Sequence, residues 1–278
     1  MQVMEPDTAQ LEALIAPVCD IVKQAGEEVM KIYLGGFEVE EKEDRSPRTT
    51  ADLASHRLIC RQLQTLTPDI PVLSEESALV PFSQRMKWEC YWLIDPLDGT
   101  REFIKKNGEF TVNVALVIGH VACLGAVYLP VQETCYFAAT GHGAFKQERE
   151  QAACRIKTRF STPDARPTVC GSRSRAGPTL QALLAQIGHH ELIHVGSSIK
   201  TCLVAEGKAD LYPRFGPTSE WDTAAAHCIV HEAGGSLVDT RLQAVRYNTK
   251  DSLLNPSFIV FGSLNDRWRD MLLPRETR

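Results

Sequence analysis

The sequence lacks the features of a membrane-spanning protein, a nucleic-acid binder and a disulfide scaffold. No apolar run approaches the roughly 18 residues that a membrane-spanning helix needs. The net charge of −5 is not the basic footprint of a protein that binds DNA or RNA polymers. The nine cysteines are an odd number and form no Cys-x-x-Cys pair, which disfavours a disulfide framework or a zinc site. A small-molecule ligand is still compatible with this sequence. It can be an anion where a bound metal makes the local electrostatic field positive.

The chain also lacks a recognisable export signal. The first seven residues, Met-Gln-Val-Met-Glu-Pro-Asp, have neither the basic nor the apolar region of a secretory signal. Most cysteines fall inside apolar segments, as free thiols packed in a reducing compartment do. We therefore expect a cytoplasmic protein. Its oligomeric state and a peripheral contact with the inner membrane stay open.

The first part of the chain changes from helical to strand periodicity near residue 110. Apolar residues at helical spacing predict helices over 11–33 and about 50–66, and Pro17 marks either a kink in the first helix or its true start. The polar residues 40–47 are predicted to form a loop. The strands predicted in this half lie at 71–74, 111–118, 121–128, 134–139 and 144–147. Short turns between adjacent strands indicate an antiparallel sheet.

In the second part of the chain, helices and strands alternate. The polar segment 148–166 has little periodicity and is the predicted junction between an N-terminal subdomain, 1–160, and a C-terminal subdomain, 161–278. Strands are predicted at 168–170, 192–195, 209–215, 236–238 and 257–261, and helices at 179–187, 197–206, 222–233 and from 265. The expected fold class is α/β of the α+β kind, with an antiparallel sheet first and mixed α/β after it.

The most informative segment runs from Trp92 to Phe103. An apolar strand ends there in Asp95-Pro-Leu97-Asp98-Gly-Thr100. Because the proline between the acids has no N–H, we expect a tight corner that directs both carboxylates and the Leu97 carbonyl into one space. The amides of Gly99 and Thr100 would open the next helix and favour an anion. The alternative is an ordinary strand-to-turn connection, since Asp, Pro and Gly are all turn residues.

Further acids stand at the ends of predicted elements. Each has an ordinary explanation: Asp52 and Asp222 as helix-terminal acids, and the pair Glu75-Glu76 as a solvated strand edge. Together with the corner they suggest one site, because loops at element ends gather into sites. No His or Cys accompanies them at ligand spacing, so all-oxygen coordination of Mg²⁺ or Mn²⁺ is expected. Such a cluster beside an anion site is typical of a multi-metal phosphate-ester hydrolase, with Asp52 and Thr100 as the proton acceptor.

Three stretches resemble the metal motifs of the lithium-sensitive, magnesium-dependent inositol monophosphatase superfamily, in that family's order and spacing. They are Ser74-Glu75-Glu76, Asp95-Pro-Leu-Asp98-Gly-Thr100 and Trp221-Asp222-Thr-Ala-Ala. Segments 95–113, 196–200 and 211–222 are similar to the bacterial 3′(2′),5′-bisphosphate nucleotidase branch. The Asp-Gly-Thr-Thr-Asn-Phe continuation usual in the inositol branch is missing here. The resemblance covers nearly the whole chain and implies a layered αβαβα sandwich of the sugar-phosphatase type.

The resemblance implies two to three Mg²⁺ ions and a role for each motif residue. Glu75, Asp95 and the Leu97 carbonyl would hold the ion that activates water, while Asp95, Asp98 and Asp222 would hold the ion that stabilises the leaving oxygen. Thr100, backed by Asp52, would orient and deprotonate the water. The residues expected at the substrate are Glu75, Leu97, Asp98, Gly99, Thr100, Gly196, Lys200 and Asp222. For Lys200 the alternative is a solvated helix residue.

The expected function is a Mg²⁺-dependent phosphatase that removes the 3′-phosphate from adenosine 3′,5′-bisphosphate. Phosphoadenosine phosphosulfate is an expected second substrate, which ties the enzyme to sulfur metabolism. One alternative is an inositol- or sugar-phosphate phosphatase with the same chemistry. The other, of a different class, is a non-catalytic nucleotide or metal sensor on a phosphatase scaffold. The sequence does not decide between 3′ and 2′ phosphates.

Overall fold

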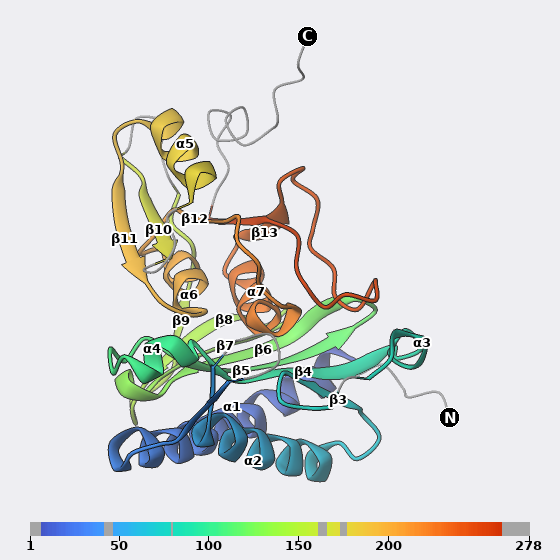
Figure 1. Ribbon diagram of the computed structural model, residues 1–278. Coiled ribbons are helices and arrows are strands. Elements are labelled where there is room, and N and C mark those ends of the chain that lie inside the picture. The colour runs from blue at the N-terminus through green and yellow to red at the C-terminus, as the bar shows by residue number, and fades with distance from the viewer. Residues whose placement is uncertain (1–6, 42–46, 79, 161–165, 173–176, 263–278) are drawn as a thin grey trace.

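Five layers of secondary structure stack on one another in this chain. The computed structural model describes residues 7–41, 47–78, 80–160, 166–172 and 177–262. A pair of helices, a seven-stranded sheet, a second pair of helices, a five-stranded sheet and one outer helix follow in that order (Figure 1). This confirms the layered α/β sandwich that the sequence predicts.

The first layer consists of α1 (Thr8–Gly35) and α2 (Thr50–Leu66), which pack on each other and on one face of the large sheet. Asp7 and Gln10 form a capping box that starts α1. The helix passes through Pro17, so the prediction that it starts there is wrong. Buried apolar residues lie on both sides of the proline, and their packing offsets the hydrogen bond that the proline removes.

A short hairpin occupies part of the segment that the sequence predicts as a loop. Its strands β1 (Val39–Glu41) and β2 (Pro47–Thr49) pair antiparallel, with residues 42–46 between them outside the described part of the chain. All of β1 is exposed, so the apolar alternation that marks a half-buried strand is absent from its sequence. The hairpin leads directly into α2.

The seven-stranded sheet has the strand order β3-β4-β5-β6-β7-β8-β9. Its strands are β3 (Val72–Ser74), β4 (Cys90–Asp98), β5 (Thr111–Ile118), β6 (Val121–Leu129), β7 (Thr134–Ala139), β8 (Gly143–Glu148) and β9 (Cys154–Ile156). The expected antiparallel order holds except at the β3 edge, where β3 and β4 are parallel. A connection that contains α3 (Phe82–Arg85) makes this crossover possible.

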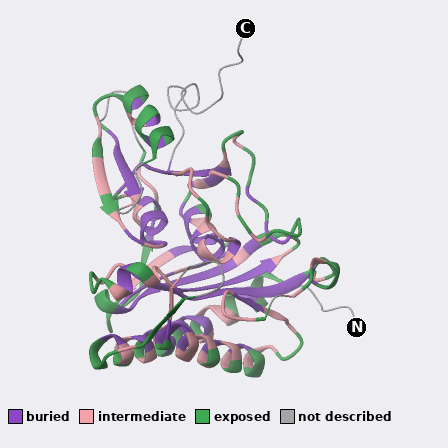
Figure 2. Ribbon diagram, viewed as in Figure 1, coloured by how far each residue is buried: buried purple, intermediate pink, exposed green. Residues whose placement is uncertain are grey.

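The five-stranded sheet is mixed and has the order β11-β10-β12-β14-β13. Its strands are β10 (Thr168–Ser172), β11 (Glu191–Val195), β12 (Leu211–Arg214), β13 (Ser236–Asp239) and β14 (Phe258–Phe261). Helices α6 (Ile199–Ala205) and α7 (Ala224–Glu232) lie between the two sheets, and α5 (Pro178–Ile187) covers the outer face (Figure 1). One apolar core joins the facing sides of both sheets to these two helices (Figure 2).

The predicted junction at 148–166 contains strand β9, which pairs with β8 and belongs to the large sheet. The segment therefore contains a strand at Cys154–Ile156 despite its low periodicity, while the division into 1–160 and 161–278 stays a prediction. The helix predicted from residue 265 lies outside the described residues. In the part of the chain that the structure describes, no helix is long and apolar enough to cross a membrane.

Candidate active site

The Asp95–Asp98 corner is a bulge inside β4 rather than the end of the strand. Asp95 pairs with Asn113 and Asp98 pairs with Thr111, so β4 has one residue more than β5 between these pairs. Pro96 falls inside the bulge, where its missing N–H breaks no ladder bond. The Leu97 amide donates to Asp95 Oδ1 at 3.0 Å. The bulge thus places both acids on the same side of the strand, as the site requires.

Two aspartates of β4 meet a third from a distant part of the chain at this corner. Ligand oxygens of Asp95, Asp98 and Asp222 lie within 4.8 Å of one another. Asp222 ends a 3-10 turn, η2 (Glu220–Asp222), before α7 begins, so the prediction that it opens the α-helix is wrong. Its Oδ2 accepts the Ser219 amide at 2.9 Å, which keeps the turn closed against the helix. Packing of η2 and α7 on β4 and β5 joins the three acids.

The electrostatics of this trio favour a cation. Burial raises the pKa of Asp95 well above its ordinary value, and repulsion from Glu75, Asp98 and Asp222 raises it further. Burial, followed by repulsion from Asp98 and Glu75, likewise raises the pKa of Asp222. A divalent cation relieves this repulsion, and a donor set made of oxygens alone suits Mg²⁺ or Mn²⁺. The residues present therefore fit the metal that the sequence leads us to expect.

Glu75 lies on the wall of the same cavity, outside the tight trio of aspartates. Its amide donates to the Ile94 carbonyl at 3.2 Å, which places it beside the last residues of β4. Leu97 also lines the site, and its carbonyl oxygen lies 3.3 Å from the Thr100 hydroxyl. The structure thus brings together all five positions expected at a metal: Glu75, Asp95, Leu97, Asp98 and Asp222.

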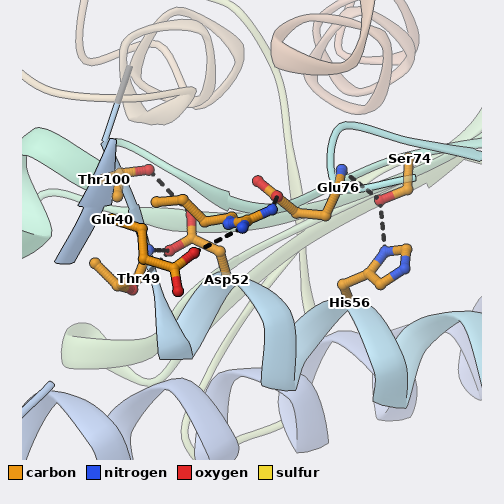
Figure 3. Close-up of polar contacts among 8 residues, drawn as sticks. Glu40, Thr49, Asp52, His56, Ser74, Glu76 and Thr100 are labelled. Carbon is orange, nitrogen blue, oxygen red and sulfur yellow. Dashed lines mark hydrogen bonds and ion pairs between the residues drawn. The ribbon is translucent and has the colours of Figure 1, made fainter. Parts of the chain in front are cut away.

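Asp52 and Thr100 form a hydrogen-bonded pair (Figure 3), and Thr100 lines the same cavity as the acid cluster. The Thr100 hydroxyl donates to Asp52 Oδ1 at 3.1 Å. The other carboxylate oxygen accepts the Thr49 amide at 2.7 Å and hydroxyl at 2.6 Å. Asp52 is therefore the capping acid of α2 and also a partner of Thr100, while its role as proton acceptor stays a prediction. Burial raises the pKa of Asp52, so this carboxylate accepts a proton more readily than an exposed one.

Gly99 starts the short helix α4 (Thr100–Ile104) in a left-handed conformation, with φ of +94°. A side chain there would be strained and would meet the Glu109 carbonyl at 2.9 Å. The amides of Gly99 and Thr100 therefore stand at the start of a helix next to the acid cluster, as the sequence predicts.

Ser198 is a site residue that the sequence analysis does not identify. Its amide and its hydroxyl lie 2.7 Å and 2.8 Å from Asp98 Oδ2, and the hydroxyl also lies 3.0 Å from the Asp222 carbonyl. Asn113 Nδ2 donates to the same hydroxyl at 2.8 Å. In the sequence, Ser198 looks like an ordinary residue before a helix. Its contacts with both parts of the acid cluster depend on tertiary packing, which brings the start of α6 beside Asp98, Asn113 and Asp222.

The acid cluster forms one wall of a cavity of about 310 Å3. Lys200 and Arg214 line the same cavity, together with the aromatic residues Tyr212 and Phe258. Lys200 is buried and donates to the Ser197 carbonyl at 2.7 Å, so the interpretation of a solvated helix residue is wrong. Burial lowers the pKa of Lys200 to about 8. An ammonium has three N–H donors, so Lys200 can hold its backbone partners and still bind a ligand.

Gly196 also lines the cavity, and its environment explains why it has no side chain. A Cβ atom would meet the Glu109 carbonyl at 2.7 Å and Glu102 Cγ at 2.9 Å. Its amide donates to Glu109 Oε2 at 2.9 Å. This close packing fixes the chain that leads to Ser198 and Lys200, whatever further contact Gly196 makes with a ligand.

Comparisons with known proteins find similar sequences over most of the chain. The inositol monophosphatase family model matches residues 10–269. The chain is 48% identical over 250 residues, 89% of this chain and 99% of the relative, to 3′(2′),5′-bisphosphate nucleotidase CysQ of Salmonella typhimurium. It is 47% identical over the same shares to the protein of that name from Escherichia coli K12.

Solved structures with a similar fold cover most of the chain. CysQ from Bacteroides thetaiotaomicron, a bacterial member of the inositol monophosphatase family, superposes with a TM-score of 0.77 at 39% identity, over 90% of this chain and 97% of that one. Thermotoga maritima IMPase TM1415 shares the fold at a TM-score of 0.75 and 22% identity, over 92% and 94% of the two chains. The chain belongs to the inositol monophosphatase family.

Proposed function

We propose that this chain is a Mg²⁺-dependent 3′(2′),5′-bisphosphate nucleotidase that hydrolyses the 3′-phosphate of adenosine 3′,5′-bisphosphate to AMP and inorganic phosphate. The observation that carries the proposal is a cavity lined both by three clustered aspartates and by two cations, Lys200 and Arg214. This arrangement suits a substrate with two phosphates, one at the metals and one at the cations. Relatives with this activity in their names are 47–48% identical over nearly their whole length.

The residues that line the cavity have different proposed roles. Asp95, Asp98 and Asp222, with Glu75 and the Leu97 carbonyl, would hold two to three Mg²⁺ ions. When bound, Mg²⁺ supplies Lewis-acid polarisation of the phosphate and makes water easier to deprotonate. The amides of Gly99 and Thr100 hold the oxygens of the scissile phosphate.

Thr100 and Asp52 move the proton. The Thr100 hydroxyl donates to Asp52 at 3.1 Å, which leaves its lone pairs to accept a hydrogen bond from water. As the water oxygen attacks phosphorus, its proton passes to Thr100 while the threonine proton passes to Asp52. The bond from phosphorus to the 3′ oxygen breaks, the 3′ oxygen takes up a proton from solvent water, and AMP leaves with its 5′-phosphate intact. Phosphoadenosine phosphosulfate has the same 3′-phosphate and is the proposed second substrate, with a role in sulfur metabolism.

A rate comparison between two substrates tests this proposal. The kcat/KM for adenosine 3′,5′-bisphosphate is expected to exceed that for inositol 1-phosphate by about a hundredfold or more, because only the nucleotide places a second phosphate at Lys200. The variant Lys200→Met should raise the KM for the nucleotide about tenfold or more, since it removes a charge-assisted hydrogen bond, and should barely change inositol phosphate hydrolysis. Equal or faster inositol phosphate hydrolysis would favour the sugar-phosphatase alternative. With neither substrate turned over in Mg²⁺, the sensor alternative would stand.

A further inference from the structure

The turn that carries Glu75 is fixed on one side by its own backbone. Strand β3 pairs with β4 through Ser74 and Ile94, and the Ser77 amide closes the turn onto the Ser74 carbonyl at 3.1 Å. Within the turn, the Glu76 amide donates to Ser74 Oγ at 3.3 Å. These bonds fix the path of the chain, but they do not hold the turn against α2 and the hairpin that lie beneath it.

Two side chains from those elements supply that contact, one on each side of Glu75. His56 of α2 hydrogen-bonds Ser74 Oγ through Nδ1 at 2.8 Å (Figure 3). Arg48 of the β1–β2 hairpin lies with Nη1 3.7 Å from Glu76 Oε2, and its Nη2 donates to Glu40 Oε2 at 2.6 Å. The guanidinium therefore joins the hairpin to the turn, and Glu40 binds its other nitrogen.

The contact between Arg48 and Glu76 is enclosed, whereas that between Arg48 and Glu40 is open. The side chain of Glu76 is 1% exposed, that of Arg48 33% and that of Glu40 62%. An enclosed ion pair loses much more than an exposed one when one partner is removed, because the remaining charge stays desolvated. Glu76 also repels the carboxylate of Asp52, so its charge bears directly on the pair formed by Asp52 and Thr100.

We propose that Arg48 is a positioning residue that clamps the Glu75–Glu76 turn to the β1–β2 hairpin and neutralises Glu76 beside Asp52. Through the turn it fixes Glu75 for metal binding, and through Glu76 it limits the negative charge next to the proton acceptor. The second effect rests on the proposed hydrolytic function. The first concerns only the affinity of the protein for a divalent cation.

Titration calorimetry with Mn²⁺ alone tests the clamp without any substrate. Arg48→Met should weaken Mn²⁺ binding about tenfold, the usual cost of losing a group that orients a metal ligand, while Arg48→Lys should weaken it by less than about threefold. The matched control Glu40→Gln alters the exposed side of the same guanidinium and should leave binding unchanged. Circular dichroism and the Tm of the metal-free proteins establish that the variants are folded.

Kinetics with the nucleotide in Mg²⁺ add a second readout. At saturating metal, Arg48→Met should lower kcat about tenfold and leave the nucleotide KM within about twofold, because Arg48 acts on Asp52 and Glu75 rather than on the substrate. A folded Arg48→Met protein with wild-type Mn²⁺ affinity would overturn the proposal. If Arg48→Met does not fold, wild-type affinity in Arg48→Ala would overturn it, and tighter binding in Arg48→Lys than in Arg48→Ala would support it. Wild-type protein that binds Mn²⁺ but does not hydrolyse the nucleotide would contradict the proposed function alone.

Discussion

Asp95→Asn is expected to lower kcat at saturating Mg²⁺ by about a thousandfold or more, because Asp95 lies at the centre of the proposed metal site and metal ions contribute several kcal/mol to the transition state. The fold should survive the change. An asparagine Oδ1 can still accept the Leu97 amide, which Asp95 accepts at 3.0 Å.

The same variant should be at least as stable as wild type when metal is absent. Asp95 is 1% exposed, and burial and the neighbouring carboxylates raise its pKa, so its negative charge destabilises the metal-free protein. A neutral amide removes that repulsion. The Tm in EDTA and kcat in Mg²⁺ together check the prediction. Asp69→Asn, which changes an exposed acid that does not line the cavity, is the control. Near-normal kcat, or a large loss of Tm in EDTA, would contradict the role given to Asp95.

Thr100→Val should lower kcat by about 100- to 10,000-fold, the range for loss of a general base system, with little change in the Mg²⁺ concentration at half-maximal rate. Valine has nearly the shape of threonine but cannot pass a proton from water to Asp52, 3.1 Å away. Thr100→Ser keeps the hydroxyl and is expected to retain most of the activity.

The two members of this pair should also act as one unit. Asp52→Asn should cause a loss similar to that of Thr100→Val, and the double variant should be hardly slower than either single one. If the loss of kcat in the double variant equals the product of the two single losses, Thr100 and Asp52 act separately. Activity of Thr100→Val close to wild type would mean that the proton takes another route.

The acid cluster could be predicted from the sequence because the features that indicate it lie close together along the chain or at element boundaries. Asp95, Asp98 and Pro96 lie within four consecutive positions, and a proline between two acids after an apolar strand forces an irregular backbone. Asp222 and Glu75 each stand at an element boundary, where side chains can converge. The layers could be expected from the same periodicity, because strands with short turns pair with their neighbours.

The residues that hold the cluster in place could not be found in the same way. Ser198 and Arg48 act through contacts with partners far along the chain or on other elements, and these contacts follow from tertiary packing. The β1 strand is exposed throughout, so no apolar pattern announces it. At Pro17 the local signal is misleading. The proline favours a helix start, but apolar packing on both sides of it keeps the helix continuous.

The most direct measurement follows the fate of the oxygen from water. Adenosine 3′,5′-bisphosphate hydrolysed by the wild-type protein in ¹⁸O-enriched water with Mg²⁺ can be examined by ³¹P NMR. Direct attack of water at the 3′ phosphorus predicts AMP without label and inorganic phosphate with one ¹⁸O, and no reaction in EDTA. Adenosine 3′-monophosphate as the product, label in the nucleotide, or hydrolysis that persists without metal would contradict the proposed site and reaction.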